Sequence, residues 1–147
     1  MFERILVCTD GSPLSAKAVA AAVKLAALAG AELFALKVVQ HYAASFHEGA
    51  FPRNFAMHDQ LEQGWVDAAH DALAEIEQDA RGAGLNVTTL TPISDSIGET
   101  IIATARKCDC GLIVMASHGR RGISRLLMGS ETQYVLTHSQ VPVLVLR

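Results

Sequence analysis

The chain has 147 residues, of which 50% are hydrophobic and 18% are charged, and this composition excludes an intrinsically disordered chain. The net charge is −3 with a pI of about 6.0, which argues against the basic face of a nucleic-acid-binding protein. No apolar run is long enough to span a membrane and residues 1–4 do not resemble a signal peptide, so we expect one soluble, cytoplasmic domain over residues 1–147.

The first part of the chain reads as strand, helix, strand. Residues 5–8 are expected to form a short apolar strand. A helix is expected over 13–29, because Ser12 is a good N-cap and Pro13 suits the first helical position. Gly30 is the expected C-terminal glycine of this helix. A second strand is expected over 32–39.

The stretch 40–59 has no regular pattern and contains aromatic residues together with His41, His47 and His58. The irregular histidine spacing favours a solvated loop over a metal site. Because long loops in compact domains are usually functional, we expect a lid or a surface for a partner protein.

The second part of the chain continues the alternation. We expect a helix from Leu61 to Ala80, ended by Gly82 or Gly84, and a strand over 85–90.

Two serines then mark helix starts. Ser96 and Ser130 each begin a capping-box pattern, and the helices that follow flank an apolar strand over 111–115. The last strand is expected over 141–146, with Pro142 indicating a sheet edge or a strand start.

Strands alternating with helices predict an α/β fold with a five-stranded parallel sheet and helices on both faces. Two strand orders fit, 2-1-3-4-5 and 3-2-1-4-5. In the second order, strands one and four are neighbours, the winding direction reverses between them, and a ligand is expected at the carboxyl ends of both strands.

The residues at those two strand ends predict a phosphate site. Strand one is followed by Thr9, Asp10, Gly11 and Ser12, and strand four leads into the loop 116–130, which contains Gly119, Gly129 and Ser130 together with Arg120, Arg121 and Arg125. Glycines let backbone N–H groups approach an anion, and the helix N-terminus that follows adds partial positive charge. The loop is not a P-loop, because it contains no lysine.

With these residues placed, the chain resembles the universal stress protein family over its whole length. Nucleotide-binding members of that family carry G-x2-G-x9-G-[ST] after strand four, and the corresponding residues here are Ala116, Gly119, Gly129 and Ser130.

The resemblance implies the 3-2-1-4-5 order, a crevice for ATP (or ADP or AMP) with Mg²⁺, a backbone contact of Val38 with adenine, and a homodimer through the last strand. Asp10 is the expected ribose or metal contact. The full set of expected nucleotide-binding residues is Thr9, Asp10, Gly11, Ser12, Val38, Met115, Ala116, Ser117, His118, Gly119, Arg120, Arg121, Gly129, Ser130, Glu131 and Thr132.

One position departs from the motif, because Ala116 replaces the first glycine. If the motif needs a positive φ there, alanine is strained by about 1 kcal/mol. If it needs only a close approach of the phosphate, one methyl group is tolerated.

Two functions fit these observations. The first is an ATP-dependent stress-response regulator with at most slow hydrolysis or autophosphorylation, since His118 is the only nearby residue with a pKa suited to a general base. The second is a nucleotide-independent dimeric adaptor that binds a partner protein through the stretch 40–59. A phosphoacceptor receiver is disfavoured, because Asp10 has no acidic neighbour.

Overall fold

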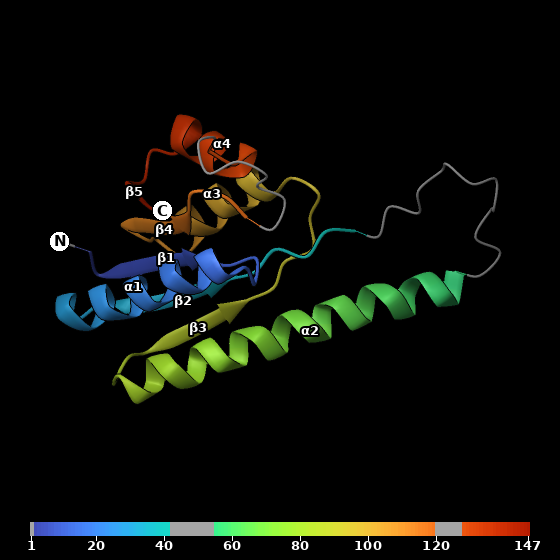
Figure 1. Ribbon diagram of the computed structural model, residues 1–147, viewed down its shortest axis with the longest axis horizontal. Coiled ribbons are helices and arrows are strands. Elements are labelled where there is room, and N and C mark those ends of the chain that lie inside the picture. The colour runs from blue at the N-terminus through green and yellow to red at the C-terminus, as the bar shows by residue number, and fades with distance from the viewer. Residues whose placement is uncertain (1, 42–54, 120–127) are drawn as a thin grey trace.

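The computed structural model describes residues 2–41, 55–119 and 128–147 (Figure 1). The elements in chain order are β1 (Arg4–Cys8), α1 (Pro13–Ala29), β2 (Glu32–Leu36), α2 (Phe55–Gly82), β3 (Val87–Leu90), α3 (Ile97–Lys107), β4 (Leu112–Ala116), α4 (Ser130–His138) and β5 (Val143–Leu146).

These strands form a parallel sheet in the order β3-β2-β1-β4-β5. The second of the two expected orders is therefore confirmed. In the central strand, Val7 pairs with Ala35 of β2 on one side and with Val114 of β4 on the other. The segments that follow β1 and β4 consequently leave the sheet side by side at its carboxyl edge.

Helices cover both faces of the sheet, as Figure 1 shows. The face that carries Ile5 and Val7 packs against the alanine-rich side of α1 and against Leu73 of α2. The opposite face carries Leu6 and packs against α3 and α4. Because side chains alternate along a strand, the apolar run of β1 fills both cores at once.

The predicted ends of α1 are confirmed. The side chain of Ser12 accepts a hydrogen bond from the N–H of Ser15, and Pro13 is the first helical residue. Gly30 ends the helix with a φ of 66°, a left-handed conformation that glycine adopts without strain.

Three strands are shorter than expected. β3 begins at Val87 rather than at residue 85, because the N–H of Leu85 donates to the carbonyl of Ala80 and closes the end of α2. In the other two strands proline is the physical reason. β2 ends at Leu36 rather than at residue 39, because Pro92, two residues beyond the end of β3, has no N–H to continue the ladder. Only an isolated bridge between Val39 and Ile93 remains beyond it. β5 likewise begins at Val143, directly after Pro142.

Helix α2 begins at Phe55, so the expectation of a loop over the whole of 40–59 was wrong for its last five residues. Neither glycine nor proline occurs between Phe55 and Gln63, so nothing in the backbone prevents the helix from extending there. The rest of that stretch, 42–54, lies outside the described residues. No helix in the described part of the chain combines the length and apolar character needed to cross a membrane.

Neither of the expected capping boxes forms. Ser96 is the N-cap of α3 but its side chain makes no capping hydrogen bond. Ser130 is the first residue of α4, and the N-cap is Gly129, which has no side chain. The N-terminus of α4 is therefore left without a side-chain cap.

Candidate functional site

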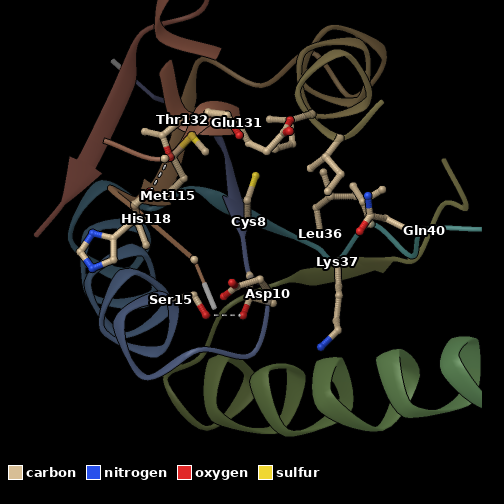
Figure 2. Close-up of a pocket in the computed structure, with 18 of the residues that line it drawn as sticks. Cys8, Asp10, Ser15, Leu36, Lys37, Gln40, Met115, His118, Glu131 and Thr132 are labelled. Carbon is tan, nitrogen blue, oxygen red and sulfur yellow. Dashed lines mark hydrogen bonds between the residues drawn. The ribbon is translucent and has the colours of Figure 1, made fainter. Parts of the chain in front are cut away.

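A cavity of about 510 Å³ opens at the carboxyl ends of β1, β2 and β4, which is within the usual size range of small-molecule sites (Figure 2). Most of the residues predicted from the sequence line it. They are Thr9, Asp10, Val38, Met115, Ala116, His118, Gly119, Gly129, Ser130, Glu131 and Thr132.

The remaining predicted residues do not line the described cavity. Gly11 and Ser12 belong to the turn between β1 and α1, where the N–H of Ser12 contacts Asp10, and the side chain of Ser117 is buried. Arg120 and Arg121 lie outside the described residues.

The turn between β1 and α1 uses its polar groups internally. The N–H of Gly11 donates to the hydroxyl of Thr9, at 3.1 Å. The N–H of Ser12 donates to the carboxylate of Asp10 at 2.9 Å, and the hydroxyls of Thr9 and Ser15 are 2.9 Å apart. Because Ser12 also caps the helix by accepting from the N–H of Ser15, two N–H groups at the N-terminus of α1 are already used, and the carboxylate of Asp10 lies in front of it. This helix start is therefore a poor place for a phosphate.

Gly119 brings the second loop against that carboxylate. A β-carbon at position 119 would overlap Oδ2 of Asp10 and lie 3.3 Å from its Cγ. Gly119 has no positive φ, so the position needs glycine for the close approach and not for its backbone conformation. Asp10 is thereby held at the floor of the cavity between the two loops.

The N-terminus of α4 differs from that of α1 in that residues 129–132 line the cavity and no side chain caps the helix. The first intrahelical bond runs from the N–H of Gln133 to the carbonyl of Gly129, which leaves the N–H groups of residues 130–132 outside the helical ladder. The hydroxyl of buried Thr132 donates to the carbonyl of Ala116 at 2.9 Å and ties this helix start to the end of β4. The N–H of Gly129 donates to the carbonyl of Ser117 at 2.8 Å and closes the base of the loop. This geometry suits an anion at the start of α4.

Glu131, which the sequence predicts to be a ligand contact, has a different immediate partner. Its carboxylate accepts a hydrogen bond from the N–H of Gly98 at the start of α3, at 2.8 Å. A β-carbon at Gly98 would lie 3.2 Å from that carboxylate and 2.6 Å from the ring of Tyr134. Glu131 therefore caps α3 from the neighbouring helix, and the absence of a side chain at Gly98 allows the two helices to approach.

His118 is placed at the margin of the cavity. Its Nδ1 lies 3.0 Å from the hydroxyl of Ser117, and Figure 2 shows the imidazole pointing away from Asp10. The ring is thus not directed at the cavity floor, which agrees with a residue that shapes the loop.

The opposite end of the cavity is apolar. It is lined by Leu36 at the end of β2, by Val38 just beyond that strand, and by Ile97 and Ile101 of α3. Cys8 of β1 forms part of the cavity floor, and Met115 of β4 lies beside Thr132 (Figure 2). Burial raises the pKa of Cys8 to about 12, with a smaller contribution from Cys110, so the thiol remains neutral and the floor carries no charge there.

Sequence reasoning missed several lining residues, because they are brought in by the sheet order and by packing. They are Cys8, Ser15, Leu36, Lys37, Gln40, Trp65, Ile97 and Ile101. Lys37 and Gln40 lie within two residues of the expected contact Val38, but no motif marks either of them as a lining residue.

Comparison with known proteins identifies the family of the chain. The model of the universal stress protein family matches residues 1–147. The chain belongs to the universal stress protein family. A relative from Bacillus subtilis, the universal stress protein YxiE, is 30% identical over the full length of both chains.

Solved universal stress proteins share the fold. The structure of the universal stress protein UspA from Lactobacillus plantarum superposes with a TM-score of 0.84 at 28% identity, covering 98% of this chain and 97% of that one. A universal stress protein in complex with cAMP has a TM-score of 0.72 at 22% identity, covering 99% and 97%. Another, from Archaeoglobus fulgidus in complex with dAMP, has a TM-score of 0.65 at 17% identity, covering 98% and 97%.

In this universal stress protein, Ala116 at the first motif position is not strained. Among the described non-glycine residues only Asp109 has a φ in the left-handed region, 54°, whereas Ala116 lies in β4 and pairs with Leu146. Backbone strain at Ala116 is therefore excluded. The only consequence of alanine at this motif position is one methyl group at the cavity wall.

Proposed function

We propose that this universal stress protein binds an adenine nucleotide in the cavity and acts as a nucleotide-dependent regulator. The observation that carries the proposal is that one cavity combines an uncapped helix N-terminus at one end with an apolar pocket at the other. The uncapped helix N-terminus suits a phosphate chain, and the apolar pocket suits a purine base. The complexes of two other family members with cAMP and dAMP support the same ligand class.

We further propose ATP as the ligand, with ADP and AMP as weaker alternatives, and Asp10 as the contact to the ribose or to Mg²⁺. The described residues contain no group of three or more His, Cys, Asp or Glu side chains that could hold a metal ion. A Mg²⁺ ion bound here would therefore rely on the phosphates and on water, with Asp10 as the protein carboxylate on the cavity floor. This agrees with the preference of Mg²⁺ for one or two carboxylates plus substrate phosphates.

The residues present favour binding over rapid turnover. The carboxylate of Asp10 is engaged by the N–H of Ser12, that of Glu131 by the N–H of Gly98, and the ring of His118 is turned away from the cavity floor. None of these groups is placed as an obvious base for a nucleophilic water. A switch with at most slow hydrolysis is the function that this geometry supports best.

The proposal is tested by purifying the protein without added nucleotide, denaturing it, and identifying any released small molecule by mass spectrometry. We expect an adenine nucleotide in near-stoichiometric amount, or a rise in melting temperature when Mg-ATP is added to empty protein. If no nucleotide is released and neither ATP, ADP nor AMP stabilises the protein, the proposal fails. A nucleotide-independent adaptor would then be the better account.

We also propose that the protein forms a homodimer through β5. β5 is an edge strand of the sheet, and Leu144 in it is 39% exposed. An apolar edge of this kind is a template for pairing with a second chain.

Replacing Leu144 by Lys is expected to convert the dimer into a monomer, because a charged side chain on an edge strand opposes pairing. Size-exclusion chromatography with light scattering measures the change. The matched control is Leu28→Lys, since Leu28 is 88% exposed at the end of α1 and should leave the dimer intact. A wild-type protein that elutes as a monomer would contradict the homodimer.

A further inference from the structure

Gln40 occupies a distinctive position in the cavity. It follows Val38 on the segment that leaves β2, and Figure 2 shows its side-chain amide beside Leu36, on the apolar side of the cavity. Lys37, by contrast, points away toward α2. Gln40 therefore presents a polar group with both a donor and an acceptor next to the apolar surface that suits a base.

The backbone around Gln40 is held from two sides. On its N-terminal side, the N–H of Val39 donates to the carbonyl of Pro92 at 2.9 Å, and the carbonyl of Val39 accepts from the N–H of Ser94 at 2.8 Å. On its C-terminal side, the N–H of His41 donates to the carboxylate of Asp95 at 3.1 Å.

The ring of His41 adds a contact to α2, because its Nδ1 lies 3.5 Å from the carboxylate of Glu62. The segment that carries Gln40 is thus tied both to the loop before α3 and to α2. A segment held in this way need not order its backbone when Gln40 binds a ligand, which lowers the entropic cost of binding.

The side-chain amide of Gln40 has no hydrogen-bond partner within the part of the chain that the structure describes. The neighbouring lining residues on this side, Leu36, Ile97 and Ile101, are apolar and offer none. The amide is therefore available to a ligand, and its pattern of one acceptor beside one donor matches the edge of adenine.

We propose that Gln40 selects adenine over other purines by pairing with the base edge. Its amide oxygen accepts from the 6-amino group of adenine, and its amide nitrogen donates to N7. Guanine presents two acceptors, O6 and N7, to the same amide, so only one of the two hydrogen bonds can form. This inference rests on the proposed function, because it assigns the base-specific contact of the same nucleotide site.

The test measures the binding of three ligands by calorimetry in the presence of Mg²⁺: ATP, GTP, and the triphosphate of purine riboside, which lacks the 6-amino group. The wild-type protein is expected to prefer ATP over the other two by about tenfold, the discrimination typical of one bidentate contact. Gln40→Leu should bind all three within about threefold of one another, because leucine cannot read the edge. Gln40→Glu keeps the acceptor but loses the donor, and so should retain part of the preference for ATP over the analogue without the amino group.

The matched control is Gln78→Leu, an exposed glutamine of α2 that does not line the cavity, and it should keep the wild-type preferences. Thermal melts establish that each variant is folded. Trp65, the one tryptophan of the chain, lines the cavity and gives a second, fluorescence-based titration.

The outcomes separate the two proposals. If Gln40→Leu binds ATP but keeps the wild-type ratio between ligands, Gln40 does not read the base, while the nucleotide site stands. If the wild-type protein binds none of the three ligands, the proposed function fails and the role of Gln40 fails with it.

Discussion

Replacing Ser130 by Asp is expected to weaken ATP binding by about tenfold or more while raising the melting temperature. Ser130 is the first residue of α4, whose N–H groups we assign to the phosphates. A carboxylate there repels the phosphates, and about 1.4 kcal/mol of repulsion corresponds to a tenfold loss of affinity. The same negative charge stabilises a helix N-terminus by about 0.3–1 kcal/mol, which is a rise of roughly 1–3 °C for a domain of this size.

The opposite signs of the two effects make this variant informative. Ser130→Asn is the matched control, because asparagine removes the hydroxyl and has almost the shape of aspartate but carries no charge. Calorimetry with ATP and with adenosine completes the design, since adenosine has no phosphate and its affinity should not respond to the charge. Equal ATP affinities for the Asp and Asn variants would mean that the phosphates do not lie at the start of α4.

The second large effect is expected for Gly119→Ala. The added β-carbon would overlap the carboxylate of Asp10, so the loop or the carboxylate must move. Overpacking of this kind costs about 1–3 kcal/mol of folding free energy. Because both groups line the cavity, we also expect ATP affinity to fall by about tenfold or more, measured by calorimetry beside a thermal melt.

A double-mutant cycle with Asp10→Ala identifies the cause. Shortening Asp10 removes the overlap, so Gly119→Ala should cost much less stability in the Asp10→Ala background. Gly64→Ala is the control for a glycine substitution, because a β-carbon at Gly64 in α2 meets nothing within 4 Å and should stabilise the helix slightly. Additive losses in the cycle would refute the contact between Gly119 and Asp10 as the origin of the effect.

Local rules predicted most of the elements. The cap at Ser12, the terminal glycine at Gly30 and the apolar strands all depend on neighbours a few residues away, and the structure agrees with them. The length of β2 was wrong because a distant residue decided the outcome. Pro92 stops the ladder beyond β2, and this cannot be read from β2 itself.

In the candidate site, too, some residues could be predicted from local sequence and others depended on distant segments. Three residues of the two loops, Asp10, Gly119 and Gly129, could be predicted from residue type and spacing. All three line the cavity. The reason for Gly119 could not be predicted, because the group that excludes a side chain there is a carboxylate 109 positions earlier in the sequence. Gln40 was missed because only the pairing of β2 with β1 and β3 brings its segment to the cavity.

The sequence by itself determined the class of fold, the family and the loops that meet at the carboxyl edge of the sheet, because periodicity, caps and a spaced glycine motif are local properties. Only the tertiary structure decided between two helix starts with similar sequences. The N-terminus of α1 is capped by Ser12 and faced by Asp10, whereas that of α4 has a glycine N-cap and faces the cavity. Its neighbour Glu131 is drawn away by the N–H of Gly98 on another helix. The physical reason is that a backbone N–H group makes one good hydrogen bond, and the packing of distant segments determines which N–H groups remain for a ligand.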